Sequence, residues 1–234
     1  MNPSGNIVIL TGAGISAESG LQTFRAADGL WEGHRVEDVA TPEAFARDPA
    51  QVHRFYDARR ARLGEVEPNA AHVALARLDA EWRGKLLIVT QNVDDLHERA
   101  GAKRLLHMHG EVRKGWCLAC DERFAWDGPM GTEAVCPSCQ TRGMVRPDIV
   151  WFGEMPYAME AIDAALFHAD LFVSIGTSGA VYPAAGFVQT ARYRGARTLE
   201  INLEPSQGSM LFDERRYGAA GIEVPKWVAE VLGS

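Results

Sequence analysis

The 234-residue sequence contains no apolar run near the roughly 20 residues that a membrane span requires. Its first six residues also lack the basic stretch and the long apolar run of a secretory signal. Basic residues are outnumbered, since 24 Lys and Arg stand against 31 Asp and Glu, for a net charge of −7. These absences argue against a membrane partner and against direct binding of nucleic acid. We expect a monomeric, cytoplasmic protein.

Cysteine is scarce as well, because the chain has four, too few for a disulfide scaffold. They form two pairs, Cys117-x-x-Cys120 and Cys136-x-x-Cys139, separated by 15 residues. Such pairs can direct four thiolates to the corners of a tetrahedron, the geometry that Zn²⁺ prefers, and leave no position open for substrate. We expect one structural zinc ion. Four unrelated thiols are the alternative, and a redox role fits less well because neither pair lies at a strand-to-helix junction.

The remaining composition, 47% hydrophobic and 24% charged, is that of a folded globular protein. Apolar runs of strand length recur at residues 7–10, 86–89, 171–175 and 198–201. Helical patterns lie between them, at residues 71–82, 158–167 and 183–193. Near-continuous apolar strands are typical of a parallel sheet covered on both faces. This alternation predicts an α/β fold with a Rossmann-like, doubly wound sheet.

Two regions interrupt the alternation. Residues 33–63 are rich in helix formers and charge, and residues 113–147 hold every cysteine with little helical periodicity. We interpret them as a helical insertion and a zinc-binding module, which together form a smaller domain. The Rossmann-like domain is then expected to comprise residues 1–32, 64–112 and 148–234.

A glycine-rich segment, Thr11-Gly12-Ala13-Gly14-Ile15-Ser16-Ala17, follows the first predicted strand. It fits the dinucleotide pattern G-x-G-x-x-G/A, in which small residues let backbone amides approach a pyrophosphate. A plain strand-to-helix turn is the alternative. A dehydrogenase would carry an acid at the end of a second strand near residue 35, whereas the first such acid is Glu204. We expect nucleotide binding without hydride transfer.

Polar residues follow the other predicted strands. They are Gln91, Asn92 and Asp94, then Gly176, Thr177 and Ser178, and finally Asn202 and Glu204. The carboxyl ends of parallel strands meet at one edge, so these residues should form one site with the glycine-rich segment. His107 and His109 are candidate bases, and because they share one face of an extended segment, spacing does not choose between them.

Together these motifs resemble the sirtuin family of NAD-dependent protein-lysine deacylases, in the family's order from about residue 7 onward. The matching segments are Gly12–Gly20, Thr23-Phe24-Arg25, Gln91–Asp94, His109-Gly110, both cysteine pairs, Val150–Glu154, Gly176–Ser178 and Asn202–Glu204. The departures are mild: Val93 stands where Ile is more usual, and Gly179-Ala180 where Ser-Val is common.

The resemblance implies that NAD is consumed as a co-substrate. The acyl oxygen of a modified lysine attacks the ribose as nicotinamide leaves, which gives an alkylimidate. His109 then acts as general base on a ribose hydroxyl, and the products are free lysine and O-acyl-ADP-ribose. The residues so assigned to NAD are Gly12, Ala13, Gly14, Ser16, Ala17, Thr23, Phe24, Arg25, Trp31, Gln91, Asn92, Val93, Asp94, Gly176, Thr177, Ser178, Asn202, Leu203, Glu204 and Ala220.

Acyl-lysine proteins or peptides are the partners that the resemblance implies. The peptide is expected to pair strand on strand between Val150-Trp151-Phe152-Gly153 and the loop that ends at Val181. A protein ADP-ribosyltransferase using the same NAD site remains an alternative. A nucleic-acid-binding zinc ribbon and an ordinary oxidoreductase fit less well.

The helical insertion suggests which acyl group is removed. Val52, Tyr56, Arg59 and Leu63 fall on one helical stripe, where a phenol and a guanidinium are out of place if the stripe only packs. The alternative for Arg59 is a side chain that extends to the surface.

Tyr56-x-x-Arg59 matches the pair that marks desuccinylase and demalonylase sirtuins, where it holds the distal carboxylate of the acyl chain. Ala27 stands in the loop where that class keeps a small residue, which leaves room for a longer acyl chain. We expect a desuccinylase and demalonylase that retains deacetylation. Arg60 and Arg62 are expected to be solvated.

Overall fold

The computed structural model describes residues 4–22, 30–31 and 33–233. Within these ranges six parallel strands form the central sheet, in the order β11-β10-β9-β1-β4-β5. Their bounds are β1 (Ile7–Thr11), β4 (Leu86–Thr90), β5 (Leu105–His107), β9 (Leu171–Ile175), β10 (Arg197–Asn202) and β11 (Glu214–Tyr217). The four strands predicted from apolar runs are the four inner strands. The predicted α/β class is confirmed.

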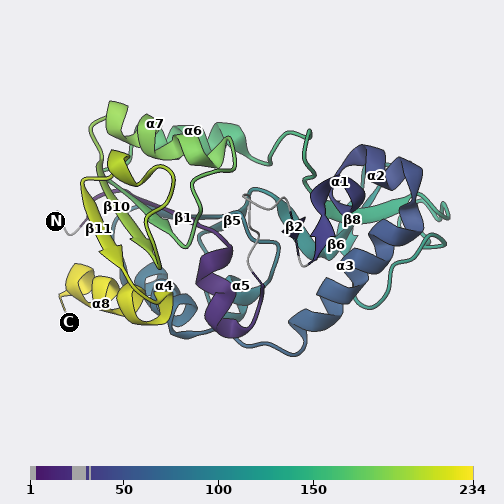
Figure 1. The fold of residues 1–234 in the computed structure, drawn as a ribbon, viewed down its shortest axis with the longest axis horizontal. Helices are drawn as coiled ribbons and strands as arrows, with labels where there is room; N and C mark the ends of the chain where they lie inside the picture. The colour runs from purple at the N-terminus through teal and green to yellow at the C-terminus, as the bar shows by residue number, and fades with distance from the viewer. Residues whose placement is uncertain (1–3, 23–29, 32, 234) are drawn as a thin grey trace.

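Helices cover both faces of this sheet (Figure 1). On one face α4 (Ala70–Glu81) and α8 (Ala220–Leu232) pack onto the sheet, and on the other α6 (Met159–Phe167) and α7 (Phe187–Tyr193) do so. The predicted stripe of α4 is buried, since Ala71, Leu75 and Leu78 have no exposed surface. A 3₁₀ turn, Ala184–Gly186, precedes α7. No helix of the described ranges is long and apolar enough to cross a membrane.

A smaller part of the molecule lies at the far end from both termini (Figure 1). It contains α1 (Val36–Val39), α2 (Pro42–Arg47) and α3 (Pro49–Leu63), beside a three-stranded antiparallel sheet. The sheet strands are β6 (Gly110–Cys117), β7 (Arg123–Ala125) and β8 (Val145–Ile149), and β2 (Leu30–Trp31) pairs with β3 (His34–Arg35). Helix α3 begins at Pro49 because the Asp48 carboxylate accepts from the Gln51 amide as N-cap.

The strand order places a topological switch point beside β1. From β1 the chain adds β4 and β5 on one side, and then returns to add β9, β10 and β11 on the other. The register aligns Thr11 with Thr90 on one neighbour and Ile175 on the other, so the three carboxyl ends are level. Ligands of open α/β sheets bind outside the carboxyl ends at such a point.

Two glycine turns meet there. Gly14 follows β1 and donates its N–H to the carbonyl of Gly176 over 2.8 Å. Gly176 has φ +64°, and a Cβ on it would lie 2.4 Å from the Ile15 nitrogen. A Cβ on Gly14 would lie 2.7 Å from the Gly176 Cα. Both glycines are therefore required by the contact between the two loops.

We expect Gly176→Ala to lower the free energy of unfolding by more than the roughly 1–2 kcal/mol that left-handed backbone alone costs a non-glycine residue. Gly195→Ala is the matched control, because Gly195 has φ +87° but nothing within 4 Å of an added Cβ. Urea unfolding of both variants measures the difference. Equal losses would show that the contact with the Gly14 loop does not require glycine.

Candidate active site

The carboxyl end of the sheet opens into a cavity of about 970 Å³ between the two parts of the molecule. Every described residue that the sequence assigned to NAD or to the peptide lines this cavity, including His109. Thr23, Phe24, Arg25 and Ala27 lie outside the described residues. Residues separated by more than 200 positions in the chain, from Gly12 to Ala220, are thus brought to one place.

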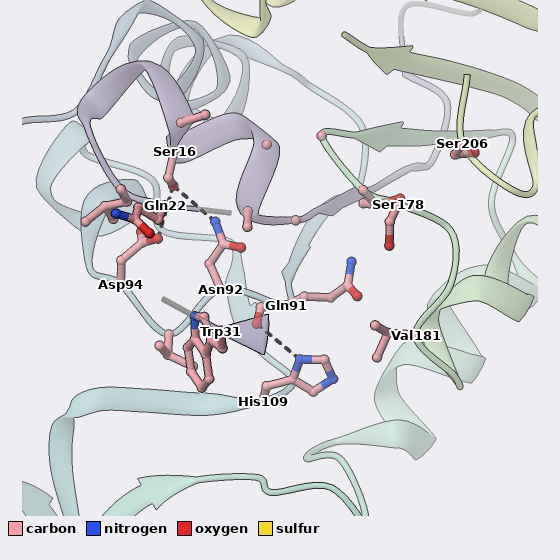
Figure 2. A pocket seen from close by; sticks show the side chains of 18 of the residues that line it. Ser16, Gln22, Trp31, Gln91, Asn92, Asp94, His109, Ser178, Val181 and Ser206 are labelled. Carbon is pink, nitrogen blue, oxygen red and sulfur yellow. Dashed lines mark hydrogen bonds between the residues drawn. The ribbon is translucent and has the colours of Figure 1, made fainter. Parts of the chain in front are cut away.

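A buried polar network forms one wall of the cavity (Figure 2). The Ser16 hydroxyl donates to Asp94 Oδ2 over 3.0 Å and accepts from Asn92 Nδ2 over 3.1 Å. Beneath it, His72 Nε2 lies 3.4 Å from the same hydroxyl, while His72 Nδ1 accepts from the Asn69 amide. Burial raises the pKa of Asp94 to about 6 and lowers that of His72 to about 4. The network therefore fixes the Asn92 amide and one carboxyl group in a cavity wall.

The structure distinguishes the two histidines. His109 lines the cavity, whereas His107 does not appear among its lining residues. His109 Nδ1 lies 3.1 Å from the carbonyl of Gln91 and so donates to it (Figure 2). This bond leaves Nε2 on the other side of the ring as the acceptor. Burial lowers the pKa of His109, so the ring is neutral and able to take a proton at neutral pH.

Three of the four residues of the predicted stripe of α3, Tyr56, Arg59 and Leu63, line the same cavity. Tyr56 has no exposed surface and Arg59 is 8% exposed, yet both line the cavity. The indole N–H of Trp151 donates to the Tyr56 hydroxyl over 3.0 Å. The Arg59 guanidinium donates to the Phe55 carbonyl over 2.8 Å, and its Cζ lies 3.2 Å from the Phe55 ring centroid and 4.8 Å from that of Trp31. A buried cation is held against aromatic rings beside the cavity.

The prediction that Arg60 is solvated is wrong. Arg60 is 4% exposed and pairs with the Asp57 carboxylate over 2.6 Å. Its guanidinium also donates to the carbonyls of Val112 and Gly128, on β6 and in the loop before the second cysteine pair. These partners lie far away in the sequence, so helical spacing did not reveal them. Arg62, in contrast, is exposed as predicted.

The cavity is also lined by residues that the sequence did not assign to NAD, to the peptide or to the acyl group. They are Leu21, Gln22, Tyr182, Pro183, Pro205, Ser206, Gln207, Gly218 and Ala219, among others. Four of them, Gln22, Tyr182, Pro205 and Ala219, are immediate neighbours of assigned residues, and that adjacency was the available signal. Between the assigned loops, Asn202 Nδ2 donates to the Thr177 carbonyl over 2.8 Å and ties the ends of β9 and β10 together.

The four cysteines cluster as a zinc-binding module. Their sulfur atoms all lie within 4.8 Å of one another, and the Cys117–Cys139 and Cys120–Cys136 Sγ distances are both 3.7 Å. A tetrahedron with zinc–sulfur bonds of about 2.3 Å requires about 3.8 Å between sulfurs, so the donor set fits Zn²⁺. The surrounding core is small, with Met130, Ala134 and Val145 as its buried members besides the cysteines. With so few buried apolar residues, we expect a bound metal ion to stabilise this module.

We expect the purified protein to contain near-stoichiometric zinc, and Cys120→Ser to lose that zinc and several kcal/mol of unfolding free energy. Ser138→Ala is the matched control, because Ser138 lies between two ligands but supplies none. Elemental analysis and thermal unfolding measure the two effects. A metal-free, folded protein with four free thiols would contradict the assignment.

The comparisons with known proteins agree with this geometry. A model of the Sir2 family matches residues 12–183. An NAD-dependent protein deacylase of Vibrio vulnificus (strain YJ016) is 59% identical over 232 residues, which are 98% of this chain and 95% of that protein.

Two solved structures of similar fold were determined with ligands bound. A complex of a Sir2 homologue with NAD superposes with a TM-score of 0.87 at 38% identity, covering 96% of this chain and 88% of that one. A complex of Sir2 with a p53 peptide and NAD⁺ superposes with a TM-score of 0.80 at 28% identity, covering 97% of this chain and 93% of that one.

Proposed function

The chain belongs to the Sir2 family, and from this premise we propose that it is an NAD-dependent protein-lysine deacylase that consumes NAD as a co-substrate. The observation that carries the proposal is the convergence of His109, the Ser16–Asn92–Asp94 network and the glycine turns on one cavity. In this proposal residues 1–32, 64–112 and 148–234 form the NAD-binding domain.

Bound NAD would supply an electrophilic ribose carbon once its bond to nicotinamide breaks. The chain's residues position that reaction. Gly14 and Gly176 bring two backbone loops close together where they would hold the pyrophosphate, and Asn202 and Glu204, at the carboxyl end of β10, would hold another part of NAD. Asn92 and Asp94 line the nicotinamide end, where their side chains are already fixed through Ser16. Little side-chain ordering is then left for substrate binding.

His109 takes a proton from a ribose hydroxyl through Nε2. The Gln91 carbonyl accepts from Nδ1 and thereby selects the tautomer whose Nε2 is free of hydrogen. Because burial keeps the pKa of the ring below its usual value, the base is present in its neutral form across neutral pH. A general base held this way contributes typically 10²- to 10⁴-fold to rate.

The peptide is proposed to lie along the Val150–Gly153 segment and the loop that ends at Val181. Both contribute residues to the cavity. The Arg146 guanidinium, 3% exposed, holds the first segment by a bidentate pair with Glu154, at 2.7 and 3.0 Å. Backbone pairing with an edge of this kind gives affinity with little sequence selectivity.

The acyl group is proposed to be succinyl or malonyl, with acetyl as a poorer substrate. The support is the phenol of Tyr56, which belongs to an apolar cluster, and the guanidinium of Arg59, which lies against aromatic rings of that cluster; both side chains line the cavity. The Tyr56 oxygen accepts from Trp151, so its own hydrogen can be donated to a carboxylate. A planar guanidinium matches a carboxylate, and in this buried setting the pair gains more than it would in water.

The test is the identity and stoichiometry of the products. With a succinyl-lysine peptide and NAD, mass spectrometry is expected to find free lysine peptide, nicotinamide and O-succinyl-ADP-ribose in equal amounts. ADP-ribose attached to a protein side chain, with the acyl-lysine intact, would identify an ADP-ribosyltransferase instead. Formation of NADH would identify an oxidoreductase.

A further inference from the structure

His107 has an environment that the reaction above does not use. Its side chain is 7% exposed and lies beside the cavity wall. Nδ1 lies 3.0 Å from the carbonyl of Asn92, and Nε2 lies 2.6 Å from Glu98 Oε1 on α5 (Leu96–Ala100). A carbonyl and a carboxylate both accept, so the ring donates from both nitrogens, and it does so only as the imidazolium.

The charges around His107 favour that cation. The groups that face it are Glu98 and His97 on α5, Asp94 beyond β4, and Glu111 on β6, which is itself paired with Lys114. Burial alone would lower the pKa of His107. The hydrogen bond and charge of Glu98, together with smaller contributions from Asn92 and Glu111, outweigh burial, so the pKa of His107 is raised.

The position of His107 relative to His109 gives it a specific target. The two histidines lie two residues apart and bind the carbonyls of consecutive residues, Asn92 and Gln91. The backbone of Asn92 is thus held by His107 while its side chain is held by Ser16. Asn92 is one of the two residues that line the nicotinamide end in the proposed function.

We propose that His107, held as a cation by Glu98, is a positioning residue that fixes Asn92 for NAD and nicotinamide. The inference rests on the proposed function and adds a residue that touches neither substrate. When His107 loses its proton, one nitrogen keeps a hydrogen and the other presents a lone pair. The hydrogen stays on Nε2, where it is donated to the charged Glu98. Nδ1 then turns a lone pair toward the Asn92 carbonyl, and the two repel each other.

Two results are expected of His107→Ala. The KM for NAD and the inhibition constant for nicotinamide should both rise roughly tenfold, the loss expected for one charge-assisted hydrogen bond. The KM for the acyl-peptide should stay within about twofold. A general loss of packing would instead raise the KM for both NAD and the acyl-peptide and would lower the melting temperature. That outcome would overturn the positioning role.

The decisive test uses Glu98→Gln, which keeps the acceptor and the shape but removes the charge. For the wild type, kcat/KM for NAD should fall as pH rises through the raised pKa of His107, above pH 6.5. In Glu98→Gln this fall should begin at least about one pH unit lower. Removing a nearby opposite charge lowers the pKa of the histidine by about that amount. Glu81→Gln, the same change on the exposed end of α4, should match the wild type.

Coincident profiles for Glu98→Gln and the wild type would overturn the inference. The same measurements separate it from the proposed function. If the wild-type enzyme turns over no acyl-peptide, the proposed function has failed. If the wild type is active and only the Glu98→Gln shift is missing, the positioning role alone has failed.

Discussion

Replacing His109 with alanine is expected to lower kcat by about 10²- to 10⁴-fold with acetyl-, malonyl- and succinyl-lysine peptides alike. The reason is that His109 offers Nε2 to the cavity as a neutral base, with Nδ1 committed to the Gln91 carbonyl. Binding of NAD should persist, because no other lining residue is altered. Steady-state kinetics and calorimetric titration with NAD measure the two properties.

The wild-type pH profile provides a second test of the same residue. Since the pKa of His109 lies below 6.5, the active neutral form is present above that pKa and is lost as pH falls through it. The acid limb of kcat should therefore lie below pH 6.5. His168→Ala, an exposed histidine at the end of α6, is the matched control and should keep full activity. Full activity in His109→Ala would contradict the mechanism.

Arg59→Met should lower kcat/KM for succinyl-lysine by about 100-fold while acetyl-lysine changes by less than about threefold. A buried charge-assisted pair is worth about 1.5–3 kcal/mol, and each 1.4 kcal/mol is tenfold. An acetyl group carries no charge to lose. Methionine keeps the apolar stem that packs among Phe55 and Trp31, which reduces structural damage.

Arg54→Met is the control for that variant, because Arg54 lies on the same helix and is exposed. Competition between succinyl- and acetyl-lysine peptides in one reaction gives the ratio of specificity constants directly. Equal losses on the two peptides would show that Arg59 supports the cavity without contacting the acyl carboxylate.

The inner part of the sheet was readable from the sequence, and its edges were not. β1, β4 and β9 are covered on both faces, so their residues are almost uniformly apolar, and β10 carries Leu199 and Ile201 in its buried middle. β11, an edge strand, reads Glu-Arg-Arg-Tyr and alternates between partly buried and exposed side chains. β5, the opposite edge, has three residues. Neither carries the long apolar run by which the inner strands were found.

The site followed from topology more than from any one motif. A parallel sheet brings the polar residues that follow β1, β4, β9 and β10 to one edge, so predicting parallel strands also predicted that these residues meet. The structure places them around one cavity. What spacing could not supply was side-chain direction. It left His107 and His109 equivalent, and it missed the burial of Arg60, whose partners belong to other elements.

The most direct measurement compares acetyl-, malonyl- and succinyl-lysine versions of one peptide, each with NAD, for the wild type and His109→Ala. The wild type is predicted to release the acyl group from all three in an NAD-dependent reaction, fastest from the two acidic groups, and the variant from none at a comparable rate. The absence of NAD-dependent turnover on every peptide would contradict the assignment as a protein-lysine deacylase. A wild type that removes acetyl faster than succinyl and malonyl would contradict the proposed role of Arg59 and Tyr56.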